Sequence, residues 1–396
     1  MQSVDAAGLG IGDDYPPRIM GVLNVSKESP YDPSVFDDPG EAAAYVDEEL
    51  IGEGADIVDV GLESANKKFD VLSAEGELDR LDTAVETLES TSGSAVWSIE
   101  TRYAEVAEAA LDRGFDMVND IAGFADPEMP EVCREYDVAV GKMASPPDIE
   151  RPGAIEETPW AERRSADWAA EADYVDQVYE ALTQNGLTDK TIVDPAFGGW
   201  SEAKTLENDR ETFRRLREFR GLGQPMLVSI NRKNFLRSLA DRSTEEALPV
   251  SLAATAMAVE RGAHVIRTHD VAETVDAATI GEAFTRERVT VDGDLHIEEL
   301  DVTAAGEAAR HFERIGADGD PSGAVSRAYE LRGLDTETRN ELVTAAAEAG
   351  CQFRPGTGDG TALLYGSEAA LARLAERTAV PRPLAATLAG SPPADR

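Results

Sequence analysis

Short apolar runs alternate with longer amphipathic segments between Arg18 and about Gly281. This alternation is typical of βα units that build a parallel sheet. The intervening segments either show helical periodicity, as in Ala104–Arg113, or are rich in alanine, as in Leu252–Arg261. The runs expected to be strands are Ile19–Val25, Asp56–Gly61, Ala95–Glu100, Met117–Ile121, Val138–Met143, Thr191–Asp194, Pro225–Ile230 and His264–Arg267.

Eight strands with helices between them predict an α/β protein built on a (β/α)8 TIM barrel, whose usual length of about 250 residues fits this region. A doubly wound open sheet is the alternative. The first expected strand is not followed by the G-x-G-x-x-G sequence of that class, however. We therefore predict a barrel over residues 18–285, preceded by an N-terminal extension over residues 1–17.

The composition changes after about Thr285. Residues 286–380 combine helical patterns with one strand-like apolar run, Ala362–Tyr365, and are predicted to form a small α/β domain of unknown role. Residues 381–396 are rich in Pro, Ala and Gly, which predicts a disordered tail.

Polar residues stand at the ends of most predicted strands. A barrel of this class carries its site at the carboxyl ends of its strands, so these side chains are expected to meet at one mouth. A single Asn or Asp after a strand is more often a helix cap or turn residue, but here the pattern recurs at seven strand ends. The residues are Asn24, Asp59, Glu100, Asn119, Asp194, Arg232 with Lys233, and Arg267 with His269.

The chain is strongly acidic, with 77 Asp and Glu residues against 37 Lys and Arg and a net charge of −40. Such a surface repels nucleic acid and anionic membranes, and it suits a salt-rich cytoplasm in which ions screen the self-repulsion. We therefore expect a cytoplasmic protein of a halophile, with no nucleic-acid or membrane partner. No apolar run approaches the length of a membrane span, and the N-terminus does not follow the pattern of a signal peptide.

Lysine is rare in this chain, and six of its seven lysines fall in or after the predicted strands. Lysine and arginine at the mouth of a barrel bind phosphate oxygens. The pattern predicts a positive rim for an anionic ligand, around carboxylates and asparagines that suit a nitrogen-rich ring; the alternative is chance together with the preference of lysine for loops. The six residues are Lys27, Lys67, Lys68, Lys142, Lys204 and Lys233.

Six pieces of the chain resemble dihydropteroate synthase, over nearly all of residues 18–281. The resemblance implies a pterin-binding TIM barrel that condenses (dihydropterin-6-yl)methyl diphosphate with p-aminobenzoate in folate biosynthesis and releases diphosphate. Related pterin-binding methyltransferases share the Asn-Asp strand ends but handle no diphosphate, so the Arg-Lys and Arg-x-His pieces favour the synthase. The pieces are Met20–Val25, Glu53–Gly61, Val118–Ile121, Val193–Pro195, Arg232–Lys233 and Arg267–Asp270.

The resemblance also implies roles for individual residues, with Lys233, Arg267 and His269 as the catalytic set. The departure of diphosphate leaves a stabilised cation, so catalysis requires charge neutralisation more than a strong base. The family further implies Mg²⁺ as cofactor, held by the amide oxygen of Asn24, and a possible homodimer. The pterin would be bound by Asp59, Glu100, Asn119, Asp194, Met143 and Lys233, and the diphosphate by Asn24, Arg232, Arg267 and His269.

The loop after the second predicted strand departs from the family pattern. Where the family has Ser-Thr-Arg-Pro, this chain has Ser64-Ala65-Asn66-Lys67-Lys68, without the hydroxyl and guanidinium that serve p-aminobenzoate. Two hypotheses follow. Either Lys67 or Lys68 binds the acceptor anion in a true synthase, or the chain is a pterin-binding paralogue with another arylamine acceptor or without synthase activity. A pterin-dependent methyltransferase module is a third alternative, in which Lys233 and His269 have no role.

Overall fold

The structure is a computed structural model of the 396-residue chain, and it describes residues 1–25, 34–63, 71–198, 201, 203–286, 288–293, 295–357 and 360–389. Contacts divide the chain into two compact units, Met1–Glu287 and Arg288–Arg396. This division falls at the change of composition after Thr285.

The first unit is a (β/α)8 barrel, as predicted. The strands lie in the order β8-β7-β6-β5-β4-β3-β10-β9, and all neighbouring pairs are parallel. A parallel bridge between Val193 and Met226 joins the two ends of this order and closes the ring. The strands are β3 (Arg18–Asn24), β4 (Ile57–Gly61), β5 (Val96–Thr101), β6 (Met117–Asp120), β7 (Ala139–Met143), β8 (Thr191–Asp194), β9 (Leu227–Val228) and β10 (Val265–Thr268).

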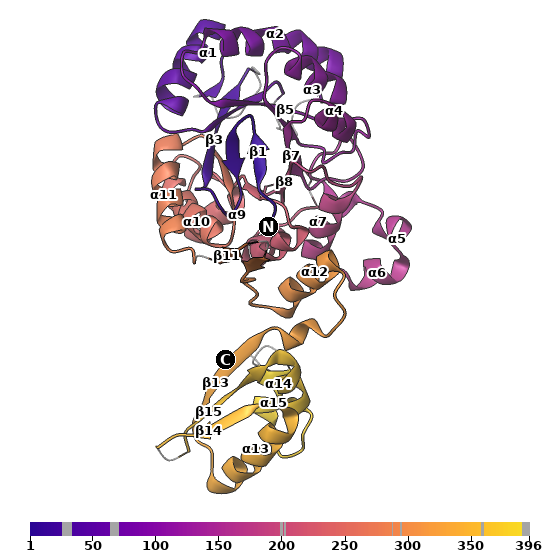
Figure 1. Cartoon of the computed structure of the whole chain (residues 1–396), viewed down its shortest axis with the longest axis vertical. Coiled ribbons are helices and arrows are strands. Elements are labelled where there is room, and N and C mark those ends of the chain that lie inside the picture. Colours follow the sequence, from indigo (N-terminus) through magenta and orange to yellow (C-terminus); the bar gives the residue numbers. More distant parts are fainter. Residues whose placement is uncertain are drawn as a thin grey trace. The chain divides into compact units, whose positions relative to one another are not determined.

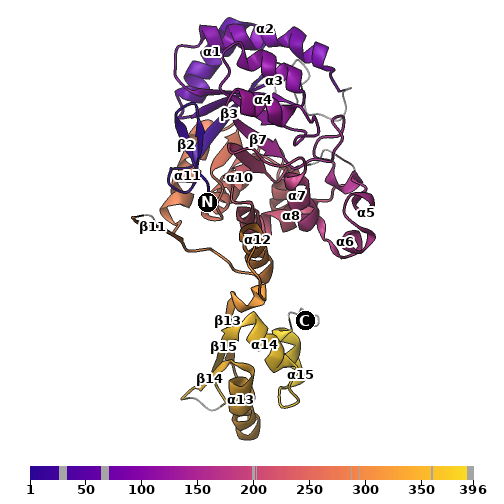
Figure 2. The same cartoon turned by 45° about the vertical axis from the view of Figure 1, so that its right-hand side comes forward.

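Helices surround the ring of strands (Figure 1). Capping side chains fix where two of these helices begin. Asp173 forms a capping box with Asp176, and Thr205 forms one with Asn208. Figure 2 shows the two helices that follow these caps, α7 and α8, side by side. The helices are α1 (Pro39–Tyr45), α2 (Ala74–Ser90), α3 (Ala104–Leu111), α4 (Met129–Glu135), α5 (Trp160–Arg163), α6 (Ala166–Glu171), α7 (Tyr174–Thr183), α8 (Leu206–Arg214), α9 (Asn234–Ala240), α10 (Leu248–Glu260) and α11 (Val271–Ala283).

The N-terminal extension closes the amino-end mouth of the barrel. It forms a hairpin of β1 (Val4–Ala6) and β2 (Leu9–Ile11), and β1 lies across the ring in Figure 1. Its buried side chains pack against one apolar residue from every barrel strand, which together form the floor of the lumen. These residues are Met20, Ile57, Val96, Met117, Ala139, Ile192, Leu227 and Val265.

An ion pair secures this plug. Both carboxylate oxygens of Asp13 accept from the guanidinium of Arg220, at 3.0 and 2.9 Å. His264 Nδ1 accepts from Met226 N, so its Nε2 carries the proton and donates to Asp13 Oδ1 at 3.0 Å. With the amino-end sealed, a ligand reaches the lumen from the carboxyl ends of the strands.

The second unit is a small α/β assembly. After the hairpin β11 (Val289–Asp292) and β12 (Leu295–Glu298) and helix α12 (Ala305–Ile315), it forms an antiparallel sheet of three strands in the order β13-β15-β14. Buried residues such as Leu342, Phe353 and Leu364 form its core. The sheet and its helices are β13 (Ser326–Leu331), β14 (Gln352–Pro355), β15 (Ala362–Ser367), α13 (Thr336–Ala349) and α14 (Glu368–Ala375).

The expectation of a disordered tail is wrong for its first part. Helix α15 spans Arg382–Leu388, and Leu388 is buried in the core of the second unit with Leu384 packed beside it. These two leucines are four residues apart and so share one helical face. Pro383 fits because proline is tolerated in the first turn of a helix. Residues 390–396 lie outside the described residues. Over the part of the chain that the structure describes, no helix has both the length and the apolarity required to cross a membrane.

Candidate active site

The alternation of side chains along each strand decides which residues face the lumen. Successive strand residues point to opposite faces. Residues two and four positions after those of the floor therefore face the lumen above it. The first layer includes Val22, Asp59, Ser98, Asn119, Gly141, Asp194 and Arg267, and the second includes Asn24, Gly61, Glu100 and Met143.

Four predicted site residues from four strands form one hydrogen-bonded chain in the lumen. Asn119 Nδ2 donates to Asp59 Oδ2 at 2.9 Å, and Arg267 Nε donates to the same oxygen at 2.7 Å. Arg267 Nη2 then donates to Glu100 Oε2 at 2.6 Å. The structure thus brings together Asp59, Glu100, Asn119 and Arg267, which are separated by up to 208 residues in the sequence.

Two polar atoms beside this chain have no hydrogen-bond partner among the described residues. They are Asp59 Oδ1 and Ser98 Oγ, both completely buried and carried by residues that face each other in the β4–β5 register. A buried polar atom without a partner costs about 1–3 kcal/mol. These atoms are therefore free to bind a polar group of a ligand or a water molecule. Ser98 was not predicted, although it shares the lumen face of β5 with Glu100.

Asp194 and Lys233 flank the same lumen. Burial raises the pKa of Asp194 to about 6, against the opposing effects of the Ala196 N–H and the Lys233 charge. Lys233 immediately precedes α9, and burial lowers the pKa of its amine. Gly198 has φ +104°, which favours glycine, and a Cβ there would lie 3.1 Å from Lys233 Nζ, so the Lys233 side chain passes close to this backbone.

Burial and neighbouring charges act in opposite directions on Glu100 and Arg267. Burial raises the pKa of Glu100, and Asp59 raises it further, while Arg267 opposes both effects. The pKa of Arg267 is raised although burial opposes this, because Glu100 and Asp59 both stabilise its charge. Arg267 therefore remains a cation in the lumen at every pH at which the protein is folded.

His269 lies at the end of β10 and is neutral near pH 7. Burial lowers its pKa to about 3, and the charge of Arg267 adds to this effect. Its Nδ1 is 3.3 Å from Ser34 Oγ, which in turn accepts from Asn24 Nδ2 at 3.0 Å. Before an anion binds, His269 is therefore a neutral hydrogen-bonding group.

The residues around Asn24 fit a magnesium ion that is held mostly by its substrate. Because Asn24 Nδ2 donates to Ser34, the amide oxygen Oδ1 is the atom turned toward Gly61, where a Cβ would lie 3.1 Å away. Among the described residues, no group of three or more carboxylate, imidazole or thiol ligands is placed to hold a metal. Mg²⁺ commonly combines one or two protein oxygens with water and substrate phosphates, and Asn24 can supply such an oxygen.

Arg232 donates its guanidinium hydrogen bonds to other protein groups, contrary to its predicted role as a diphosphate ligand. Its Nε and Nη2 both donate to the Asp270 carboxylate at 2.8 Å, and its Nη1 donates to Thr244 O and Glu245 O at 2.8 and 2.9 Å. The guanidinium of Arg232 is thus already hydrogen-bonded to other groups of the protein. Arg232 instead holds Asp270, the residue next to His269.

Two of the lysines predicted to form the positive rim bind other protein groups instead. Lys142 lies between Gly141 and Met143 on β7 and so points away from the lumen; its Nζ is buried and donates to Gln184 O and Gly186 O at 2.5 and 2.8 Å. Lys204 pairs with the buried Asp209 at 2.9 Å. Lys233 is the one member that the described structure places in the lumen wall. Lys27, Lys67 and Lys68 lie outside the described residues.

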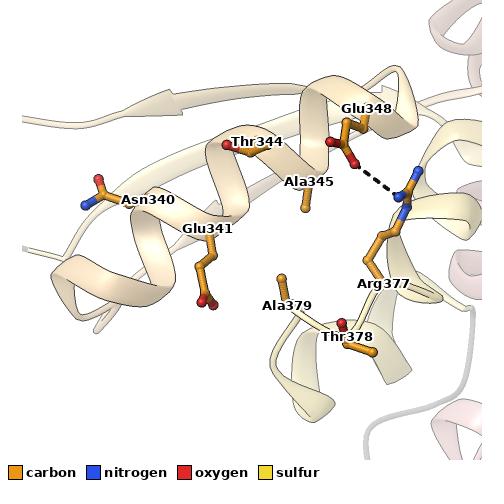
Figure 3. Close-up of a pocket in the computed structure, with 8 residues that line it drawn as sticks. All are labelled: Asn340, Glu341, Thr344, Ala345, Glu348, Arg377, Thr378 and Ala379. Atoms are coloured by element: carbon orange, nitrogen blue, oxygen red, sulfur yellow. Dashed lines mark hydrogen bonds and ion pairs between the residues drawn. The ribbon is translucent and has the colours of Figure 1, made fainter.

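The second unit carries a groove of a different character. Figure 3 shows it between α13 and the segment that follows α14, with the ion pair of Glu348 and Arg377 at 3.1 Å. Both charged side chains are about half exposed. The groove, of about 480 Å³, has none of the buried charge network of the lumen, and we place the candidate active site in the barrel.

The parallel barrel is closed, its floor is apolar and its lumen carries buried charges. These features are typical of barrel enzymes that bind small polar substrates at the carboxyl ends of their strands. Comparison with known proteins narrows this class. The family model described as "Pterin binding enzyme" matches residues 20–269. The chain belongs to this pterin-binding enzyme family, and its barrel is homologous to that of dihydropteroate synthases.

Individual relatives come from archaea and bacteria. The chain is 34% identical over 265 residues to a probable bifunctional folylpolyglutamate synthase/dihydropteroate synthase of Halobacterium salinarum, which covers 67% of this chain and 31% of that protein. The chain thus spans about a third of that relative. It is also 31% identical over 275 residues to the dihydropteroate synthase of Escherichia coli, covering 67% of this chain and 91% of that one.

Solved structures show the same barrel. The Yersinia pestis dihydropteroate synthase with a sulfonamide drug complex is 26% identical, with a TM-score of 0.59 over 71% of this chain and 98% of that chain. The Thermus thermophilus enzyme in complex with 4-aminobenzoate is 28% identical, with a TM-score of 0.56 over 72% of this chain and 100% of that chain.

Proposed function

We propose that this chain is a dihydropteroate synthase, a transferase that condenses (dihydropterin-6-yl)methyl diphosphate with p-aminobenzoate and releases diphosphate. The observation that carries the proposal is the buried lumen chain of Asn119, Asp59, Arg267 and Glu100. It combines acceptors for the N–H groups of a heterocycle with a permanent cation for a phosphate. The family match and the relatives named above support the same activity.

In this proposal the pterin lies against the first polar layer of the lumen. Asp59 Oδ1, which lacks a partner among the described residues, accepts from an N–H group of the ring. Asn119, Asp194 and Glu100 offer further donors and acceptors from β6, β8 and β5. Met143, buried at the end of β7, supplies an apolar wall, and Lys233 approaches the ring from the turn before α9.

The leaving group would be neutralised by groups at the carboxyl end of β10 and by the metal site at Asn24. Arg267 is the fixed positive charge, and neutral His269 adds a hydrogen bond to a diphosphate oxygen. A bound Mg²⁺ ion held by Asn24 Oδ1 would supply additional positive charge for the diphosphate. The bond from the exocyclic methylene carbon to the diphosphate oxygen breaks with its electron pair going to the diphosphate, the amine nitrogen forms its bond to the stabilised cation that is left, and the proton that this nitrogen then loses passes to water. An arylamine is already neutral near pH 7, so the attack requires no strong base.

The acceptor is the least constrained part of this proposal. Lys67 and Lys68, our candidates for binding the carboxylate of p-aminobenzoate, lie outside the described residues. Ala65 and Asn66, in place of the family's hydroxyl and guanidinium, favour the second candidate, a pterin-binding paralogue that uses another arylamine. Because the net charge is −40, we propose a halophilic, cytoplasmic protein without nucleic-acid or membrane partners. Its activity is therefore to be assayed at high salt. A homodimer stays a prediction.

The test is release of diphosphate by the purified protein in molar KCl, with dihydropterin diphosphate, Mg²⁺ and p-aminobenzoate. A parallel reaction without the amine measures hydrolysis alone. Amine-dependent release with dihydropteroate as product would support the synthase. Pterin binding without dihydropteroate formation would exclude it and leave the paralogue, which a panel of other arylamines then tests.

A further inference from the structure

Arg232 lies in a strained backbone conformation that four other groups of the protein hold. Its φ of +52° falls in the left-handed region, which residues other than glycine rarely adopt. Its backbone N–H donates to the Oγ of the buried Ser251 at 2.8 Å. Its guanidinium donates to the Asp270 carboxylate and to Thr244 O and Glu245 O. Strain of this kind persists only where the surrounding structure holds it, and it is concentrated at functional sites.

Asp270 does not have the usual role of an aspartate at its position. It is the N-cap residue of α11, where an Asp side chain ordinarily accepts a hydrogen bond from the first turn of the helix. In the described α11, however, no backbone N–H donates to this carboxylate. The carboxylate accepts instead from Arg232 Nε and Nη2 and from Asn231 Nδ2, each at 2.8 Å. This aspartate therefore serves the contact with Arg232 rather than the helix.

The two residues stand next to two groups of the candidate site. Arg232 directly precedes Lys233, and Asp270 directly follows His269. Their ion pair therefore joins the turn after β9 to the turn after β10. The two side chains are 14% and 11% exposed, so salt screens their attraction little. In Figure 1, α10 lies beside α9 and α11, the helices that begin at these two turns.

The ion pair decides the place of His269 more than that of Lys233. The backbone of His269 continues directly into Asp270, whose carboxylate the pair holds. Lys233 is held by hydrogen bonds that do not include this carboxylate. Its own N–H donates to Ile230 O at 3.3 Å, and the N–H of the preceding residue donates to Ser251. Loss of the ion pair therefore loosens the turn at His269 and leaves the backbone bonds at Lys233 in place.

We infer that Arg232 and Asp270 are positioning residues for His269. This deepens the proposed function and rests on it, because His269 is there a hydrogen-bonding group for the diphosphate. The ion pair holds the imidazole in the place where it meets a diphosphate oxygen, and neither member of the pair touches the ligand. The pterin ring is bound by other groups, among them Asp59 and Asn119, so its recognition does not depend on the pair.

The variant Asp270→Asn separates this role from that of a direct ligand by the sign of its effect. It removes a negative charge next to His269 and loosens the hold on the Arg232 guanidinium. For a direct ligand, this change would tighten the binding of the pterin diphosphate. For a positioning pair, it weakens that binding. Glu260→Gln is the matched control, because it removes the same charge from an ion pair with Arg217, at 2.7 Å, at the other end of α10.

Binding is measured by fluorescence, in molar KCl with Mg²⁺, for two probes. One is dihydropterin diphosphate, and the other is the same pterin with a hydroxyl group in place of the diphosphate. One hydrogen bond to a charged group is worth a factor of about 10 or more, so we expect Asp270→Asn to raise the Kd of the diphosphate probe by about 10-fold. The Kd of the hydroxyl probe should stay within about twofold, because this probe has no group for His269 to hold. The control should change neither Kd.

Arg232→Lys is the second variant. Lysine keeps the positive charge but has no planar fork, so it cannot bond both oxygens of Asp270 and two carbonyl groups at once. We expect weaker binding of the diphosphate probe alone, as in Asp270→Asn. The double variant should lose no more than the more affected single variant, because both changes break one ion pair.

Other outcomes overturn the inference. Tighter or unchanged binding of the diphosphate probe in Asp270→Asn shows that the pair does not position His269. Equal losses with both probes, together with a lowered melting temperature, show that the pair only stabilises the fold. A loss of the same size in Glu260→Gln assigns the effect to net charge alone. If the unmodified protein binds neither probe, the proposed function fails before any variant is measured, and the inference fails with it.

Discussion

Arg267 Nε lies 2.7 Å from Asp59 Oδ2 inside the barrel, although the two residues are 208 positions apart. Asp59 is completely buried and the Arg267 side chain is 17% exposed, so each charge compensates the other where water has little access. In the proposed synthase this pair links leaving-group stabilisation by Arg267 to pterin recognition by Asp59, and variants of the two residues test these roles separately.

Replacement of Arg267 by lysine keeps a positive charge but loses the fork that contacts Asp59 and Glu100. Removal of one preorganised donor for a developing anion typically costs about 10²- to 10³-fold in kcat. We expect a fall in kcat of this size for Arg267→Lys, measured by amine-dependent diphosphate release. A kcat within twofold of the unmodified enzyme would exclude Arg267 from leaving-group stabilisation.

Asp59→Asn tests pterin recognition. The change removes the carboxylate that we propose as an acceptor for the ring, and one buried hydrogen bond to a charged group is worth about 1.5–3 kcal/mol. We expect the Kd of the pterin to rise by about 10- to 100-fold, with KM for p-aminobenzoate unchanged. Ser98→Ala is informative beside it: a smaller loss of pterin affinity would show that the unpaired Ser98 hydroxyl also contacts the ligand, and no loss would assign it to a water molecule.

Lys142 and Lys233 form a matched pair, because both are lysines near strand ends but only Lys233 lines the lumen. Lys233→Glu should abolish measurable binding of the pterin diphosphate, since it places a second carboxylate beside Asp194. Lys142→Met should leave both KM values within about twofold but lower the melting temperature, because Gln184 O and Gly186 O lose their donor. A tenfold rise in KM for the pterin diphosphate in Lys142→Met would instead support the predicted place of Lys142 in the positive rim.

The buried Glu77 predicts a pH dependence of stability. Burial raises its pKa from 4.5 to about 7, in spite of the hydrogen bond from Thr101. The folded state therefore binds a proton more tightly than the unfolded state, and this contribution is present below about pH 4.5 and is lost as the pH rises through about 7. Its size is about 3 kcal/mol. Glu77→Gln should remove this slope in urea-unfolding experiments between pH 4.5 and 8, and identical slopes in the two proteins would contradict the assignment.

Truncating a side chain of the N-terminal hairpin should reduce the stability of the protein without reducing its activity. Ile11 is completely buried against the floor, and Ile→Ala in a core costs about 2–5 kcal/mol. We expect Ile11→Ala to lower the free energy of unfolding by this amount in denaturant titrations, with KM and kcat nearly unchanged at the opposite end of the barrel. Leu9→Ala, at a partly exposed position of the same hairpin, is the control and should cost less.

Much of the barrel was predictable because each strand is an apolar run and each site residue stands at its end. The same period of two could have excluded Lys142, since Met143 and Lys142 cannot both face the lumen. Arg232 is different: it lies beyond β9, has φ +52° and turns toward Asp270, so strand alternation does not reach it. Its orientation depends on a contact 38 residues away that no local pattern encodes.

The ends of the chain were harder to predict for other physical reasons. The hairpin turns at Ala7 and Gly8, both with positive φ, and Ala-Gly is a weak turn signal compared with Asn-Gly. Its strands have only three residues each and are stabilised by the barrel floor. Helix α15 likewise depends on the core that Leu388 joins. In both cases tertiary packing, which a local pattern does not show, decides the structure.

The seal at the amino end also has a kinetic consequence. In a barrel that is closed at one end, every molecule enters and leaves through the same opening. If the pterin contacts Asp59 and Asn119 in the deeper layer, an acceptor bound nearer the opening blocks its path in both directions. Such a geometry imposes a compulsory order, in which the pterin diphosphate binds before the amine. An excess of the acceptor would then trap the bound pterin and slow its exchange.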